Sequence, residues 1–221
     1  MNKYSKNKLK KAEGLVKKHL CRFKNILFVG VSGSVGAGGA KKNDDIDVLV
    51  ITKKNRLWIT RLFLNFYIRL KKVPHRRAGK KERKDEFCFN MWLDENSLEL
   101  PEFKRTKISK SDLMLLKPVL NKDEIYERFV GENKKWACQT VIARNGVTWQ
   151  SHRKHKLGSF TFPTGSLDYA RDDRCLSGFW WLVNLVTFVG QWLYMRPKMK
   201  GERVGLGYAF FHGGRKWKKV F

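Results

Sequence analysis

The sequence predicts an α+β protein: a small mixed β-sheet flanked by helices, followed by a mainly helical second half. Short apolar runs of strand length alternate with amphipathic helical patterns over residues 1–105. Beyond Pro101 the strand-like runs give way to helical patterns. Hydrophobic residues make up 42% of the 221 residues, which supplies enough apolar surface for most of the chain to fold. We therefore expect a first domain over residues 1–105 and a mainly helical region over residues 106–221.

The first elements follow from hydrophobic periodicity. Over residues 1–20, apolar side chains recur at helical spacing between lysines, which predicts a surface helix docked by one stripe. NILFVGV (25–31) predicts a buried strand, and the Gly- and Ser-rich SGSVGAGG predicts a turn after it. DDIDVLVIT (44–52) predicts a second strand, rich in β-branched residues.

The next segment completes a strand, turn, strand, helix, strand unit. Residues 56–70 predict a buried helix with one narrow wet stripe formed by Arg61, Asn65 and Arg69. Residues 71–84 form a basic loop broken by proline and glycine, and FCFNMWL (87–93) predicts a third strand.

The second half predicts three helices. Ser111 is placed to cap a short helix over residues 112–117, which Pro118 would end. A longer helix is expected over residues 123–140, and another over residues 175–195. The polar segment 146–168 carries no pattern that assigns it to a helix or a strand.

Residues 175–195 contain no charged side chain and are long enough to cross a bilayer. However, Ser177, Asn184 and Gln191 recur every seven residues and form one polar line along the helix. This line favours a buried helix with one hydrogen-bonded or wet edge. A helix that spans the membrane or lies on it is the alternative interpretation.

Charge is the strongest feature of the composition. The 47 Lys and Arg against 20 Asp and Glu give a net charge of +27, which points to polyanionic partners such as nucleic acid or nucleotide phosphates. The alternative is that these cations only coat a soluble surface. The four cysteines lack the spacing of a zinc ribbon or a disulfide framework, so we expect a cytoplasmic protein with free thiols.

Three carboxylates interrupt a long basic stretch: Asp44, Asp45 and Asp47. In a strand, residues i and i+2 point to the same side, so Asp45 and Asp47 share a face while Asp44 faces away. Two adjacent carboxylates repel unless a cation lies between them. Carboxylates on a rigid strand suit Mg²⁺, which binds through one or two carboxylates together with substrate phosphates.

The preceding turn supplies a complementary feature. Gly33 and Ser34 directly follow a predicted strand, where glycine permits close backbone approach. Backbone N–H groups in this turn, with the Ser34 hydroxyl, could cradle a triphosphate. The turn is neither a Walker A loop nor a dinucleotide fingerprint.

The stretch VSGSVGAGGAKKNDDIDVLVIT resembles the signature of the DNA polymerase β nucleotidyltransferase superfamily: Gly-Ser, a short spacer, then acid-hydrophobic-acid on a strand. The segments KKNRLWITRLF, FCFNMWLDENSLELPE, LLKPVL, YERF and YAFFH look like a little-characterised bacterial subfamily of nucleotidyltransferase-domain proteins.

The resemblance implies a mechanism. Asp45 and Asp47 would hold two Mg²⁺ ions, with Mn²⁺ as a substitute, and Gly33 and Ser34 would bind the phosphates of an NTP such as ATP. A nucleoside monophosphate would pass to an acceptor hydroxyl on RNA, a protein or a small molecule, and pyrophosphate would leave. Two other hypotheses remain: a catalytically weak nucleotide- or nucleic-acid-binding protein that keeps the fold, and a membrane-associated basic protein.

One position departs from the superfamily pattern. A third carboxylate is usual on a later strand, and Asn90 occupies the equivalent position here. An amide oxygen can bind a metal but cannot deprotonate a hydroxyl. Asp94, Asp85 and Glu86 are the alternatives, although an exposed strand-end acid is the simpler interpretation of Asp94.

Overall fold

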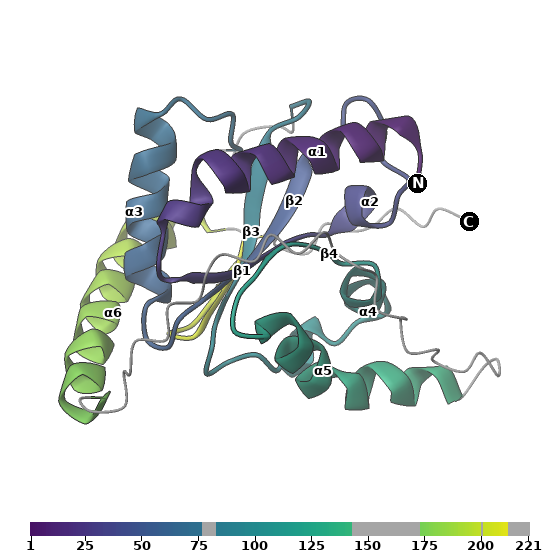
Figure 1. Cartoon of the computed structure of the whole chain (residues 1–221). Coiled ribbons are helices and arrows are strands. Elements are labelled where there is room, and N and C mark those ends of the chain that lie inside the picture. Colours follow the sequence, from purple (N-terminus) through teal and green to yellow (C-terminus); the bar gives the residue numbers. More distant parts are fainter. Residues whose placement is uncertain (77–82, 143–172, 200, 212–221) are drawn as a thin grey trace.

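A mixed six-stranded sheet with strand order β4-β1-β2-β3-β6-β5 organises the protein. The computed structural model describes residues 1–76, 83–142, 173–199 and 201–211 (Figure 1). Neighbours β2 and β3 are parallel, whereas the other pairs are antiparallel. The strands are β1 Ile26–Val31, β2 Ile46–Thr52, β3 Phe87–Asp94, β4 Lys117–Asn121, β5 Arg203–Val204 and β6 Tyr208–Phe210. The expected α+β class with a mixed sheet is confirmed.

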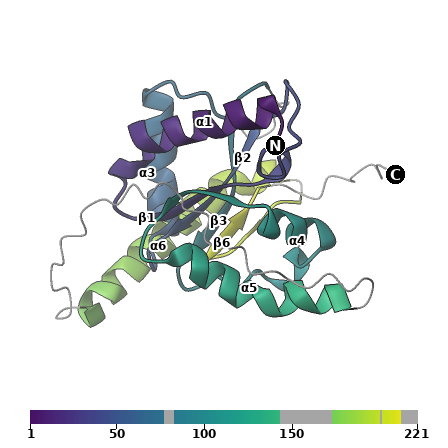
Figure 2. The ribbon, with the colours of Figure 1, turned by 45° about the vertical axis from the view of Figure 1, so that its right-hand side comes forward.

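Helices cover both faces of the sheet (Figures 1 and 2). One core joins α1 and α3 to side chains of β1 and β2, and a second joins α4 and α5 to the opposite face of the same strands. Every residue of β1 is buried as a result, which explains its uninterrupted apolar sequence. The helices are α1 Lys3–Lys18, α2 Gly33–Gly36, α3 Leu57–Leu70, α4 Lys107–Met114, α5 Ile125–Ile142 and α6 Asp173–Met195.

The second half also contributes strands. β4 lies at one edge of the sheet beside β1, and β6 pairs with β3 at the other side. The boundary at residue 105 stays a prediction, but the sheet contains strands from both sides of it.

Two details of the predicted helices are wrong. The short helix begins after Thr106, whose side chain caps it, rather than after Ser111. Pro118 does not end this helix but lies in β4, where an edge strand tolerates a missing backbone donor.

The wet stripe predicted on α3 is exposed at Arg69 but not at Arg61. Arg61 packs against α6, where its guanidinium donates to Gln191. The other exposed side chains of α3 are apolar: Leu62, Phe63, Phe66 and Leu70. The prediction failed at Arg61 because α6, far along the chain, packs over this part of α3.

The polar line on α6 faces α3, as Asn184 is 1% exposed and accepts a hydrogen bond from the Trp58 backbone N–H at 2.9 Å. The expectation of a buried helix holds for this side only, because Phe179, Val186 and Tyr194 on α6 are exposed. Among the helices that the structure describes, none combines the length and hydropathy needed to cross a membrane. The unassigned segment 146–168 lies outside the described residues.

Candidate functional site

Three chain segments meet at one end of the central strands. β1 ends there, while the parallel strands β2 and β3 begin there, with Asp47 in register with Cys88. The turn after β1 is fixed to β2 because the Ser32 N–H donates to the Asp47 carbonyl at 3.0 Å. The side chains of the β1–α2 turn and of the first residues of β2 and β3 therefore lie together at this end of the sheet.

The structure brings Asp45 and Asp47 together, as the alternation along the strand predicts. A carboxylate oxygen of each and the Cys88 sulfur all lie within 4.8 Å of one another. Asp45 is 9% exposed, and its Oδ2 lies 3.1 Å from Arg76 Nη1. Asn90 Nδ2 donates to Asp47 Oδ1 at 2.7 Å. The guanidinium and the amide offset the repulsion between two close carboxylates.

Cys88 was not predicted as a site residue. Burial raises the pKa of its thiol to about 12, and the nearby charges of Asp47 and Asp45 add to this effect. The thiol therefore stays protonated, and its soft sulfur is a poor ligand for Mg²⁺. The only sequence signal is its place two residues before Asn90 on the same strand, since a single cysteine has no diagnostic spacing.

Arg76 was missed for a different reason. It lies in the basic loop that follows α3, and nothing in the sequence separates it from the other cations of that loop. Its contact with Asp45 depends on backbone pairing that only the fold provides: the Arg76 N–H donates to the Phe87 carbonyl at 2.9 Å, which places the loop beside β3.

Gly33 allows the turn to approach Asp47 closely. Its φ of +62° lies in the left-handed region, and a Cβ atom at this position would collide with the Asp47 carboxylate. Glycine is therefore required here both by backbone conformation and by space.

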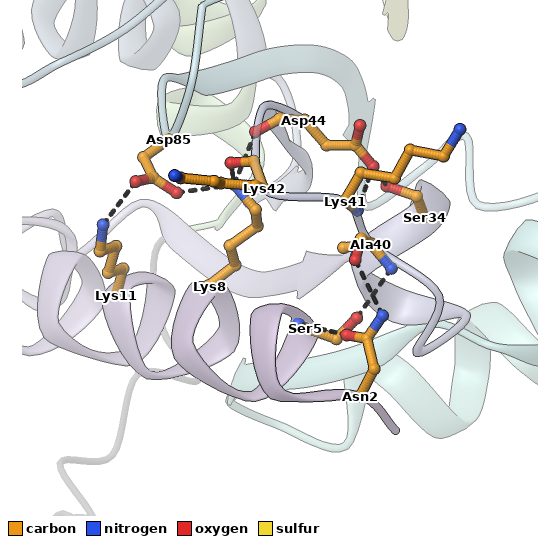
Figure 3. Close-up of polar contacts among 10 residues, drawn as sticks. All are labelled: Asn2, Ser5, Lys8, Lys11, Ser34, Ala40, Lys41, Lys42, Asp44 and Asp85. Atoms are coloured by element: carbon orange, nitrogen blue, oxygen red, sulfur yellow. Dashed lines mark hydrogen bonds and ion pairs between the residues drawn. The ribbon is translucent and has the colours of Figure 1, made fainter.

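Ser34 and Asp44 hold the loop before β2 in place. The Ser34 hydroxyl donates to Asp44 Oδ2 at 2.7 Å, and the Lys41 N–H donates to the same oxygen at 2.9 Å (Figure 3). Asp44 thus has a structural contact of its own, separate from the Asp45 and Asp47 pair. Ser34 lies beside the site, and its hydroxyl is engaged with a carboxylate.

The candidates for a third acidic position lie at different places and make different contacts. Asn90 is 8% exposed and contacts Asp47, whereas Asp94 is in register with Thr52 at the far end of β2. Thr52 is five residue steps from Asp47, or roughly 16 Å along the strand. Asp94 is also 2% exposed rather than an exposed strand-end acid, and burial raises its pKa to about 6. Asp85 instead forms ion pairs with Lys8 and Lys11.

The donor set fits a hard divalent cation. Two carboxylates offer oxygen ligands, and the Oδ1 atom of Asn90 is buried without a hydrogen-bond partner among the described atoms. A buried amide oxygen without a donor is destabilising, and a cation nearby would compensate for it. Asp45, Asp47 and Asn90 could therefore hold such an ion through three oxygens.

Comparison with known protein families gives a match over the site. The family model of the nucleotidyltransferase domain matches residues 14–129, just over half of the chain. The matched range includes β1 to β4 and every site residue described above. Neither a curated protein nor a solved structure matches the chain.

Proposed function

Because the chain belongs to the nucleotidyltransferase domain family, we propose that it transfers a nucleoside monophosphate from an NTP to an acceptor hydroxyl. In this reaction the acceptor oxygen forms a bond to the α-phosphorus, and the bond from that phosphorus to the β-phosphate oxygen breaks. Pyrophosphate leaves with the bonding electrons, and the hydroxyl proton passes to solvent. Such a transfer depends mainly on positioning and charge neutralisation.

The observation that carries the proposal is the pair of carboxylates facing a glycine turn. Asp45 and Asp47 converge within 4.8 Å, and the absence of a side chain at Gly33 lets the turn pack directly against the Asp47 carboxylate. We assign Asp45 and Asp47 to Mg²⁺, with Mn²⁺ as a substitute, and Gly33 and Ser34 to the triphosphate. When bound, the two metal ions expected here would neutralise phosphate charge and bracket the attacking and leaving oxygens.

Asn90 and Arg76 position the carboxylates. Asn90 orients Asp47 through its amide, and Arg76 holds Asp45 through its guanidinium. Together they support a defined arrangement of the pair before any ligand binds.

A second candidate function rests on Asn90. Because an amide cannot accept the proton of the acceptor hydroxyl, the site lacks one group that speeds nucleotidyl transfer in the related superfamily. A catalytically weak protein that binds nucleotide and keeps the fold is therefore the alternative.

The test compares wild-type protein with the double variant Asp45→Asn and Asp47→Asn. Both are incubated with α-labelled NTPs, Mg²⁺ or Mn²⁺, and RNA, protein or small-molecule acceptors. We expect the variant to lose transfer by about 10²-fold or more, since both anionic ligands are removed. Equal transfer by the two proteins would exclude the proposed site. Metal-dependent nucleotide binding by wild-type protein without transfer to any acceptor would support the weak-binding alternative.

A further inference from the structure

A hollow of about 400 Å³ lies between α1 and the loops that precede β2 and β3. We call it the lysine hollow, because its charged lining consists of Lys8, Lys10, Lys11, Lys42, Lys84 and Asp85. Five cations against one anion leave a strong positive excess in a concave surface. Concave surfaces lined by one sign of charge focus the electrostatic field and raise the local concentration of counter-ions.

Two of the lysines build the wall of the hollow. Lys8 is 2% exposed, and its ammonium donates to the Asp44 carbonyl at 2.7 Å and pairs with Asp85 at 2.6 Å (Figure 3). Lys11 pairs with the other Asp85 oxygen at 2.7 Å. A single carboxylate therefore serves both lysines, and these contacts fix α1 to the loops before β2 and β3.

The remaining lysines supply the binding charge. Lys10, Lys42 and Lys84 are exposed, and within the described part of the chain none of them forms an ion pair. Three exposed ammonium groups around one hollow repel each other. An anionic ligand would remove this repulsion and release its own counterions.

The lysine hollow is next to the candidate site. Asp44, whose carbonyl accepts from Lys8, also accepts from Ser34 through its side chain and directly precedes Asp45 (Figure 3). The same loop thus forms a wall of the hollow and the start of the carboxylate pair. A chain molecule that continued from the hollow along this loop would approach Asp45.

We propose that the lysine hollow binds the phosphodiester backbone of a single-stranded nucleic acid, and that this strand is the acceptor. The proposal rests on the proposed function. Repeated phosphates match several lysines at once, which one small hydroxyl compound does not. Tyr4 also lines the hollow with 45% of its surface exposed, and exposed aromatic rings beside basic grooves stack on unpaired bases.

The experiment measures binding of a fluorescent single-stranded RNA by anisotropy, without NTP or divalent metal. The test variant is Lys10→Ala, Lys42→Ala and Lys84→Ala, which leaves Lys8, Lys11 and the site residues intact. The control is Lys24→Ala, Lys54→Ala and Lys135→Ala, which removes the same charge from exposed lysines outside the hollow. Affinity is measured at several salt concentrations.

We expect the test variant to lose affinity by about tenfold or more and its salt slope to shrink by about two, since each lost phosphate contact contributes about 0.7 for single strands. The control should change affinity by less than about twofold, and only the test variant should lose transfer to RNA. Equal loss in the two variants, or no RNA binding by wild-type protein, would overturn the inference.

Different results would overturn the inference and the proposed function. If wild-type protein labels a protein or a small molecule and the hollow variant does so equally well, the inference is wrong and the proposed function stands. If RNA binds through the hollow but no acceptor is ever labelled, the proposed function fails, and the acceptor role fails with it.

Discussion

Asn90 is the residue that most limits the chemistry of the site. It lies where a third carboxylate would be expected, yet it donates a hydrogen bond to Asp47 at 2.7 Å. A carboxylate at this position would repel Asp47 instead. The amide therefore stabilises the site without metal, at the cost of one anionic ligand.

We predict that Asn90→Asp destabilises the metal-free protein but strengthens its binding of a metal ion. In EDTA the variant should be less stable than wild type by about 1–3 kcal/mol, because a hydrogen bond is lost and a buried like charge is added. Mn²⁺ should raise its melting temperature more than that of wild type, since three carboxylates bind the ion more strongly. Thermal unfolding with and without Mn²⁺ measures both effects, with Asn65→Asp on α3 as the charge control. An unchanged metal response would contradict the assigned position.

Asp94 is a buried acid outside the site. Burial raises its pKa from an ordinary 3.8 to about 6, although the backbone N–H groups of Asn96, Arg56 and Asn55 partly oppose this. The folded protein therefore binds this proton more tightly than the unfolded chain does. Stability from the protonated acid is present at low pH and is lost as the pH rises from about 4 through 6.

Asp94→Asn should remove this pH dependence. The difference in free energy of unfolding between variant and wild type should be near zero at pH 4 and grow to at most about 3 kcal/mol in favour of the variant above pH 6. Urea denaturation across pH 4–8 measures the difference and cancels the titration of the other acids. A difference that does not change with pH would show that Asp94 titrates normally.

The sequence alone was enough to predict those site residues that a local spacing rule brings together. The alternation of a strand paired Asp45 with Asp47, and the glycine after a strand identified the close approach at Gly33. Cys88 and Arg76 could not be found this way, because their positions depend on strand register and on the return of a loop to β3. Asp94 showed the converse: its type suggested exposure, but burial depends on neighbours distant in sequence.

At the scale of elements, α3 and α6 form one unit. Gln191 donates to the Trp58 carbonyl at 2.8 Å, and Asn184 accepts from the Trp58 N–H at 2.9 Å. The Trp58 N–H lies in the first turn of α3, where backbone donors have no partner within the helix. α6 therefore caps the start of α3 from the side.

Asn184→Leu should destabilise the protein by about 1–3 kcal/mol, because it leaves the buried Trp58 N–H without an acceptor. Val186→Ala on the exposed side of α6 is the control and should cost less than about 1 kcal/mol, since 63% of Val186 is exposed. Urea denaturation measures both. Equal effects would mean that the polar line contributes nothing specific.

Helices and strands with a clear hydrophobic pattern in their own sequence were predictable. Those that depend on contacts with other elements were not. The apolar runs of β1 and β2 and the periodicity of α1 and α5 gave the right element types. Pro118 was misassigned as a helix stop because only the sheet order shows that β4 is an edge strand. The short strands β5 and β6 carry too few residues for alternation to be recognised.

For the whole molecule, the sheet joins the two halves of the chain. β4 completes the sheet beside β1, and β6 covers the side of β3 that β2 leaves open. The second core contains Ile125, Phe129 and Phe210, each at most 1% exposed, packed with Phe28 of β1. The site at the starts of β2 and β3 therefore rests on strands that depend on residues after 105.

We predict that residues 1–105 do not fold cooperatively alone. Losing three fully buried side chains removes at least about 5 kcal/mol of hydrophobic stabilisation, which is comparable to the whole stability of a typical domain. The fragment would also leave the edge of β1 that pairs with β4, and the edge of β3 that pairs with β6, without a partner strand. Unpaired edges promote association. Circular dichroism melting and gel filtration of the fragment, beside the full chain, measure this. A sharp transition near the melting temperature of the full chain would instead establish residues 1–105 as an independent domain, and the nucleotidyltransferase site would then be separable from the second half.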